Sequence, residues 1–173
     1  KPAVDAKDLP VVPTLPVEDA LPLSVKDFYS GFTFHGPKLQ GIVSIDGLTD
    51  SGVSGWVKGC RPSDWVKEPL RSEWTIDPLL LDSSFQLAGY WAWVKHQRAG
   101  FPLGFKRFTQ LAPFGAGPVL CTAVFEAAAG DVMTGTLSWK DSNGKLLAVM
   151  EGVEAEFKAR DPQMGAAKKP APP

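Results

Sequence analysis

The chain has 173 residues, of which 44% are hydrophobic and 21% are charged, and its formal net charge is −1. A chain of this size and composition is expected to fold as one domain with a substantial core. The near-neutral charge gives no basic surface of the kind that nucleic acids or anionic membranes attract, and no apolar run reaches the roughly 20 residues that cross a bilayer. We therefore expect no nucleic-acid partner and no membrane span.

The composition changes near both ends of the chain. Residues 1–22 hold Pro2, Pro10, Pro13, Pro16 and Pro22, which favour extended backbone because each ring fixes φ and removes an amide donor. Residues 160–173 are rich in Ala, Pro and Lys, as interdomain spacers are. We predict a Pro-rich linker over 1–22, one folded domain over 23–159 and a disordered linker over 160–173; the alternative is that both tails have no role. The start at Lys1, without a signal-like segment, favours a piece of a cytoplasmic multidomain protein.

The folded region is predicted to contain one long helix among strands. Residues 41–46 and 52–58 form a first pair of strands. The helix begins at Asp77, which can cap free amides, with Pro78 at the first helical position, and Gly100 and Pro102 end it near residues 96–100. Apolar side chains occupy most of its circumference: Leu79, Leu80, Leu81, Phe85, Leu87, Ala88, Trp91 and Trp93. Such a helix is usually wrapped by the rest of its domain.

Four further segments, at 105–111, 119–127, 132–140 and 145–157, have the length and composition of strands, and Asp-Ser-Asn-Gly at 141–144 predicts a tight hairpin. Residues 115–118 are glycine-rich, but strand-like sequence follows them, which indicates a turn and not a phosphate loop. Five or six antiparallel strands wrapped around one long central helix describe an α+β domain with the hot-dog fold.

Cysteine and histidine are scarce. A disulfide framework needs more cysteines than Cys60 and Cys121 supply, and a four-ligand zinc site would need both of them together with His35 and His96. We expect two reduced, structural thiols and no metal site.

Two segments resemble a known family. Residues 77–86 read Asp-Pro-Leu-Leu-Leu-Asp-Ser-Ser-Phe-Gln and resemble the hPxLLDxxxQ motif at the head of the central helix in the second hot-dog of polyketide-synthase dehydratases. Residues 34–41 read Phe-His-Gly-Pro-Lys-Leu-Gln-Gly and resemble the YGPxFQG motif of that family. A segment at 27–29 before these motifs and segments at 101–105 and 139–145 after the helix also match the family's order of elements, so the resemblance covers residues 23–158. In the second motif histidine replaces the usual tyrosine, and in this respect the motif resembles dehydratase-like regions of polyunsaturated-fatty-acid synthases.

The resemblance implies the C-terminal, aspartate-bearing half of a β-hydroxyacyl-[carrier protein] dehydratase. Removing water from a β-hydroxyacyl thioester needs a base for the α-proton and an acid for the departing hydroxyl. The family supplies them as a histidine and an aspartate from two facing hot-dogs, and Asp82 matches the acid, with Gln86 one helical turn later as its helper. Without the resemblance, Asp82 would be interpreted as a second capping acid beside Asp77. The implied substrate-binding residues are His35, Gly36, Pro37 and Gln40.

The family's histidine motif, H-x-x-x-G-x-x-x-x-P, is missing. His96 and Gly100 match its first half, but Phe105 stands where proline is required, so we interpret the match as chance. For His35 we favour a hydrogen-bond donor that lines the pocket over a structural turn residue or a general base. The chain is therefore either one half of a double hot-dog, whose base comes from elsewhere, or a degenerate domain kept for architecture.

The resemblance also implies partners. The substrate would arrive on the phosphopantetheine arm of an acyl carrier protein, so the chain itself needs no cofactor, and a second hot-dog half or a homodimer partner would complete it. Two alternatives stay open, a non-catalytic dehydratase-like module that shapes or docks a synthase and a thioesterase-like or acyl-binding hot-dog, because one fold hosts several chemistries. The tryptophans are expected in the core, with the wall of an acyl channel as the alternative for some of Trp56, Trp65, Trp74, Trp91 and Trp93.

Overall fold

The computed structural model describes residues 14–16, 21–127 and 131–159. The linker predicted over residues 160–173 lies outside this part of the chain, and so does most of the one predicted over 1–22. Within the latter, Leu15 is buried, and it packs against Gly47 of the first strand.

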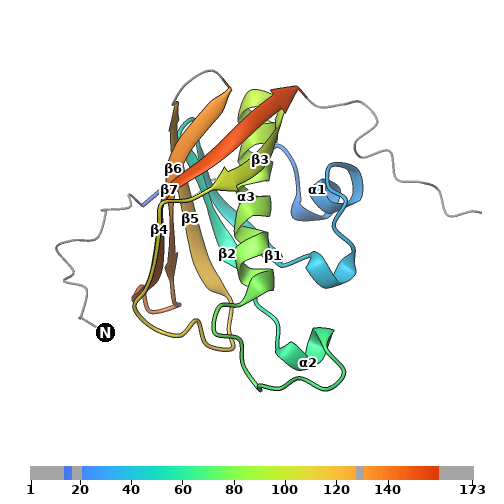
Figure 1. Ribbon diagram of the computed structural model, residues 1–173. Helices are drawn as coiled ribbons and strands as arrows, with labels where there is room; N and C mark the ends of the chain where they lie inside the picture. The colour runs from blue at the N-terminus through green and yellow to red at the C-terminus, as the bar shows by residue number, and fades with distance from the viewer. Residues whose placement is uncertain (1–13, 17–20, 128–130, 160–173) are drawn as a thin grey trace, which may run out of the picture.

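Seven strands form a single antiparallel sheet (Figure 1). In chain order they are β1 (Ile42–Thr49), β2 (Gly52–Val57), β3 (Arg98–Gly104), β4 (Arg107–Gln110), β5 (Val119–Ala127), β6 (Val132–Lys140) and β7 (Leu146–Ala159). Their order across the sheet is β1-β2-β5-β6-β7-β3, and β4 also pairs with β7.

The central helix α3 (Pro78–His96) runs along one face of this sheet, with the short helix α1 (Val25–Gly31) beside it (Figure 1). It starts as predicted, since Pro78 occupies its first turn and the Asp77 carboxylate accepts a hydrogen bond from the backbone N–H of Leu80. An antiparallel sheet packed on one long helix confirms the α+β hot-dog fold. No helix in the described residues is long and apolar enough to span a membrane.

Core packing fixes α3 on the sheet through both apolar and polar contacts. The Trp91 ring stacks on Phe125 of β5, with centroids 5.1 Å apart. Deeper in the core, the indole N–H of Trp139 donates to Oγ of Ser84 at 2.9 Å, and that hydroxyl donates to the carbonyl of Leu80. Because these groups are fully enclosed, each hydrogen bond removes the cost of burying an unpaired polar atom.

The helix ends at His96, within the predicted range of 96–100, but Gly100 and Pro102 are not the residues that end it. Gln97 closes α3 with a left-handed backbone (φ 54°), whereas Gly100 and Pro102 lie inside β3, a strand that was not predicted. Proline is tolerated there because β3 is at the edge of the sheet, where an amide donor is not needed on the outer side. Glycine and proline are usually interpreted as helix breakers, and for this reason the edge strand β3 was not predicted. The sheet formed by the described residues has seven strands, not five or six.

The other elements follow the sequence more closely. Strands β5 and β6 have the bounds predicted for them, β1 continues to Thr49, and β7 extends to Ala159. The hairpin at 141–144 is confirmed, since Oδ1 of Asp141 accepts from the backbone N–H groups of Asn143 and Lys145. Three short helices were not predicted: α1, the 3₁₀ turn η2 (Pro37–Leu39) and α2 (Pro62–Trp65).

Candidate functional site

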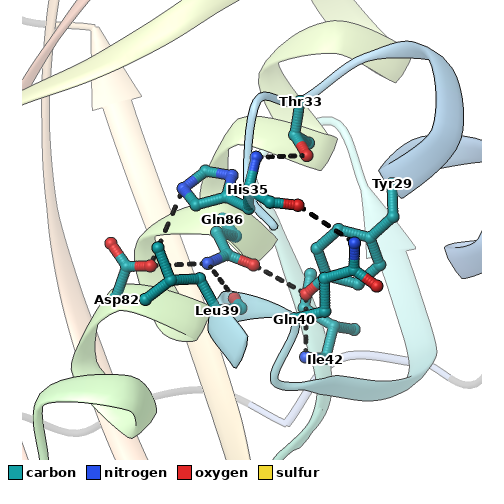
Figure 2. Close-up of polar contacts among 8 residues, drawn as sticks. All are labelled: Tyr29, Thr33, His35, Leu39, Gln40, Ile42, Asp82 and Gln86. Carbon is teal, nitrogen blue, oxygen red and sulfur yellow. Dashed lines mark hydrogen bonds and ion pairs between the residues drawn. The ribbon is translucent and has the colours of Figure 1, made fainter. Parts of the chain in front are cut away.

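The two motifs meet beside the first half of α3 (Figure 2). Asp82 and Gln86 lie one turn apart on the same side of the helix, and the segment that carries His35 and Gln40 folds over them. The predicted site residues therefore come together from parts of the chain more than 40 residues apart.

A close approach of backbone to helix makes this meeting possible. A methyl group at Gly41 would lie 2.0 Å from Oγ of Ser83 on α3, so only glycine lets the segment come this near. The turn before it is braced internally, because Pro37 starts η2 and the amide of Gln40 donates to the carbonyl of His35 at 3.0 Å. The motif at 34–41 thus forms a compact turn pressed against α3.

Gln86 is the centre of a hydrogen-bond network and is itself buried. Its Nε2 donates to Oδ2 of Asp82 at 2.6 Å and to the carbonyl of Leu39 at 2.8 Å. Its Oε1 accepts from the hydroxyl of Tyr29 at 2.6 Å, and that hydroxyl in turn accepts from the backbone N–H of Ile42 at 3.0 Å. Both N–H groups and the carbonyl of the amide are therefore engaged (Figure 2).

His35 is placed next to the carboxylate without bonding to it. Its Nε2 is 3.7 Å from Oδ2 of Asp82, too far for a hydrogen bond, and its Nδ1 is buried with no partner in the described part of the chain. The imidazole stacks on the ring of Phe34 at 4.5 Å, and its side chain is 14% exposed against 42% for Asp82. A ligand bound here would therefore lie beside the partly exposed carboxyl group of Asp82 and the Nε2 atom of His35, which is not hydrogen-bonded to Asp82.

A cavity of about 250 Å³ opens over this side of α3. Its lining is mostly apolar and rich in phenylalanine, with Asp82 and Gln86 at one end of the helical face and Gly89 and Trp93 further along it. The lining residues are Phe28, Phe32, Thr33, Phe34, His35, Asp82, Phe85, Gln86, Gly89, Trp93, Arg98, Ala99, Gly100, Phe101 and Pro102. The cavity therefore joins a polar end, where the carboxyl lies, to an apolar body.

The predicted substrate-binding residues divide into two groups in the structure. His35 lines the cavity, whereas Gly36, Pro37 and Gln40 are outside its lining and shape the turn that holds His35. Of the tryptophans, Trp91 is in the core, as expected, and Trp93 lines the cavity; its predicted alternative as the wall of an acyl channel stays a prediction.

Tyr29 is the part of the network that sequence reasoning missed. It is 57 residues from Gln86, and no local pattern links a tyrosine on a short helix to a glutamine on a later one. Burial raises the pKa of Tyr29 to about 12, and the nearby charge of Asp82 adds to this, although backbone hydrogen bonds from Ile42 and Gly41 oppose it. At neutral pH the hydroxyl therefore keeps its proton and acts as a donor.

The other chemically active side chains lie elsewhere. His96 is fourteen residues beyond Asp82 on α3, about 21 Å at 1.5 Å per residue, and packs edge-on against Trp91. This placement supports the interpretation of its motif as chance. Cys60 and Cys121 are both free, and the described residues contain no group of three or more His, Cys, Asp or Glu side chains that could hold a metal ion.

Solved structures of dehydratase domains share this fold. The chain superposes on GphF dehydratase 1 with a TM-score of 0.65, 19% identity and coverage of 86% of this chain and 53% of that one. The dehydratase domain of PpsC from Mycobacterium tuberculosis in complex with C12:1-CoA gives a TM-score of 0.60 and 22% identity, with coverage of 87% of this chain and 56% of that one. The dehydratase domain of the CurJ module of curacin polyketide synthase gives a TM-score of 0.59 and 17% identity, with coverage of 76% of this chain and 46% of that one. At these identities the likeness establishes the fold, and the chain spans about half the length of each of these structures.

Comparison of the sequence with protein families is more specific. A search of curated proteins found no match. The family described as "Polyketide synthase dehydratase N-terminal domain" matches residues 8–162, which is most of the chain and all of its folded region. Together with the hot-dog fold and the meeting of the two motifs, this match shows that the chain belongs to the polyketide synthase dehydratase family.

Proposed function

We propose that this domain supplies the acid for dehydration of a β-hydroxyacyl thioester, with Asp82 as that acid. The observation that carries the proposal is the placement of Asp82, whose Oδ2 is held by Gln86 while the side chain remains 42% exposed at the end of a mostly apolar cavity. A carboxyl that is oriented by a neighbour and still accessible is what a general acid requires.

We assign the chain to the aspartate-bearing, C-terminal half of a dehydratase. The description of the matching family names the N-terminal domain, but the motifs at 34–41 and 77–86 resemble those of the second hot-dog. Coverage of about half of each solved dehydratase is what one half of a double hot-dog would give. The meeting of both motifs at one cavity supports the same assignment.

The elimination can be followed atom by atom. A base removes the α-proton, the electrons of that C–H bond form the double bond, and the β C–O bond breaks as Asp82 gives its proton to the departing hydroxyl, which leaves as water. Asp82 is then a carboxylate and the base is protonated, so a proton must return to Asp82 before the next turnover. The hydrogen bond from Gln86 to Oδ2 leaves Oδ1 as the oxygen that carries the transferable proton.

The base and the carrier come from partners in this proposal. The histidine of a second hot-dog removes the α-proton, and the role of His35, whose Nε2 lies 3.7 Å from Oδ2 of Asp82, is to donate a hydrogen bond to the substrate beside the acid. The acyl chain is delivered on the phosphopantetheine arm of an acyl carrier protein and enters the mostly apolar cavity, so the domain needs no cofactor of its own. Histidine at position 35 favours a polyunsaturated-fatty-acid synthase, acting in the cytoplasm, as the parent assembly.

The test is dehydration of a β-hydroxyacyl thioester by a longer protein that includes the histidine-bearing hot-dog. We expect that protein to be active, the 173-residue chain to be inactive, and Asp82→Asn to lower turnover by about 10²- to 10⁴-fold. Asp50→Asn is the matched control, because its side chain is 98% exposed and lies outside the cavity lining. Undiminished turnover in Asp82→Asn, or an active isolated chain, would contradict the proposal.

A non-catalytic role is the second candidate, favoured by the missing histidine motif. The chain has two histidines, His35 beside the proposed acid and His96 at the far end of α3. If the longer protein binds acyl thioesters but leaves them unchanged, the domain is an acyl-binding or architectural module. Release of free acid from the thioester would instead indicate a thioesterase.

A further inference from the structure

We infer that Tyr29 is a positioning residue for the acid: it fixes the orientation of the Gln86 amide and thereby directs an N–H of that amide to Asp82. The inference rests on the proposed function of Asp82. Tyr29 is on α1 and does not line the cavity at Asp82; the hydrogen bonds that link its hydroxyl to Asp82 run through Gln86.

The directions of the hydrogen bonds follow from what each atom can do. The backbone N–H of Ile42 can only donate, so the oxygen of Tyr29 accepts there at 3.0 Å. The single proton of the Tyr29 hydroxyl is then free to go to Gln86, 2.6 Å away, and it requires an acceptor, which is the amide oxygen. The Tyr29 hydroxyl thus requires the oxygen of the Gln86 amide, and not its NH₂ group, on this side. The shape of the amide alone would not fix this orientation, because its oxygen and nitrogen are nearly equal in size.

The opposite side of the amide imposes the same orientation. The carbonyl of Leu39 can only accept, so it requires the NH₂ group, which donates to it at 2.8 Å. The remaining N–H points to Oδ2 of Asp82 at 2.6 Å. A flipped amide would set its oxygen against the Leu39 carbonyl and the Asp82 carboxyl, which are two acceptors, and would leave the Tyr29 proton without one.

The consequence for the acid is a choice between its two oxygens. Oδ2 of Asp82 receives the N–H of Gln86 and also faces Nε2 of His35 at 3.7 Å, whereas none of the hydrogen bonds of the described residues reaches Oδ1. The proton to be transferred therefore belongs on Oδ1. Because Tyr29 stays protonated through the neutral range, this arrangement does not change with pH there.

Tyr29→Phe removes the one proton on which this orientation depends and keeps the ring. The chain's other tyrosine offers a matched control, since Tyr90 also donates one hydrogen bond from its hydroxyl, to the carbonyl of Leu23 at 2.7 Å, away from Gln86. Both variants delete a single tyrosine hydroxyl, partly buried in Tyr29 and attached to a buried side chain in Tyr90. Only Tyr29→Phe should disturb the Gln86 amide.

The first measurement uses the 173-residue chain and follows the side-chain NH₂ signals of Gln86 by NMR, assigned with Gln86→Leu. In the unmodified chain both protons are hydrogen-bonded and should exchange slowly with water. We expect exchange to become at least tenfold faster in Tyr29→Phe and to stay unchanged in Tyr90→Phe. A folded Tyr29→Phe chain with unchanged NH₂ shifts and exchange would overturn the inference.

The second measurement is turnover by the longer protein with its histidine-bearing half. Tyr29→Phe should lower kcat about 5- to 50-fold with little change in KM, Tyr90→Phe should not, and adding Tyr29→Phe to Gln86→Leu should have no further effect. Additive losses would overturn the inference, because they would show that Tyr29 acts independently of Gln86. An inactive longer protein would refute the proposed function alone, and the NMR result would still decide whether Tyr29 orients the amide.

Discussion

The Nε2 atom of His35 lies 3.7 Å from Oδ2 of Asp82, close enough for charge to matter and too far for a hydrogen bond. This spacing leaves the imidazole free to donate to a third group between or beside them. It also places His35 on the same side of the cavity as Asp82, the proposed acid, whereas the base of the proposed elimination would approach the adjacent carbon.

The first prediction concerns His35→Tyr in the longer, active protein. If the imidazole acts as a donor, tyrosine offers a hydroxyl at the same position, so most of the activity and the basic limb of the pH–rate profile should be retained. The measurement is kcat/KM across pH. A loss as large as that of Asp82→Asn would mean that His35 is the base.

The second prediction concerns Gly89, which continues the face of α3 that carries Asp82 and Gln86. A methyl group there would meet nothing within 4 Å, so Gly89→Ala should fit and, through its better helix propensity, stabilise the fold by about 0.5–1 kcal/mol. Gly89→Leu should occupy the cavity and weaken binding of long acyl chains more than short ones. Titration of C4 and C12 acyl thioesters into each variant, with Gly89→Ala as the control, measures this, and an equal loss for both lengths would contradict it.

The third prediction compares two adjacent buried serines. Ser84 accepts a hydrogen bond from the indole of Trp139, so Ser84→Ala should lower the free energy of unfolding by about 1–3 kcal/mol by leaving that N–H unpaired. Ser83 is equally buried, but its hydroxyl has no partner among the described residues, so Ser83→Ala should cost much less. Urea denaturation of both variants is the measurement, and equal losses would show that the Trp139 contact contributes little.

The fourth prediction concerns stability at alkaline pH. Complete burial raises the pKa of the Cys121 thiol to about 12, against an ordinary value of 9.0. The unfolded chain therefore releases this proton at lower pH than the folded chain, so the stabilising contribution is full below pH 9 and declines as pH rises toward 12, by up to about 1.4 kcal/mol per pH unit. Tyr29 adds a similar decline that begins near pH 10.

Denaturation of the reduced chain at pH 8, 9, 10 and 11 should show this decline. Cys121→Ala should have a lower stability at pH 8, because it leaves a small cavity, but a shallower decline between pH 9 and 11. The slope and not the absolute stability is the diagnostic quantity. A variant with the same slope as the unmodified chain would place the alkaline sensitivity elsewhere.

The sequence predicted the local parts of this molecule well. The bounds of β5 and β6, the start of α3 at Asp77 and Pro78, and the contact between Asp82 and Gln86 all depend on residues close in sequence, where capping and periodicity are informative. The last of these spans one helical turn, so its spacing alone placed the two side chains together.

The sequence could not predict the features that tertiary structure decides. Gly100 and Pro102 have the same local signature at a helix end and in an edge strand, and only the pairing of β3 with β7 distinguishes the two. Tyr29 joins the site through contacts 13 and 57 residues away, with Ile42 and Gln86, which no periodicity records. The cavity likewise depends on β3, an element whose existence was missed.

The contact between Gly41 and Ser83 couples the chemistry of the site to the folding of the domain. A methyl group at position 41 would lie 2.0 Å from Oγ of Ser83 and 3.0 Å from the carbonyl oxygen of Lys58, so it would displace the turn, the helix or the serine side chain. The carboxyl and the imidazole are carried by these two surfaces, so the distance between them is set by a contact that neither of them makes. A substitution at position 41 should therefore change the distance between the Asp82 carboxyl and the His35 imidazole without contacting either group.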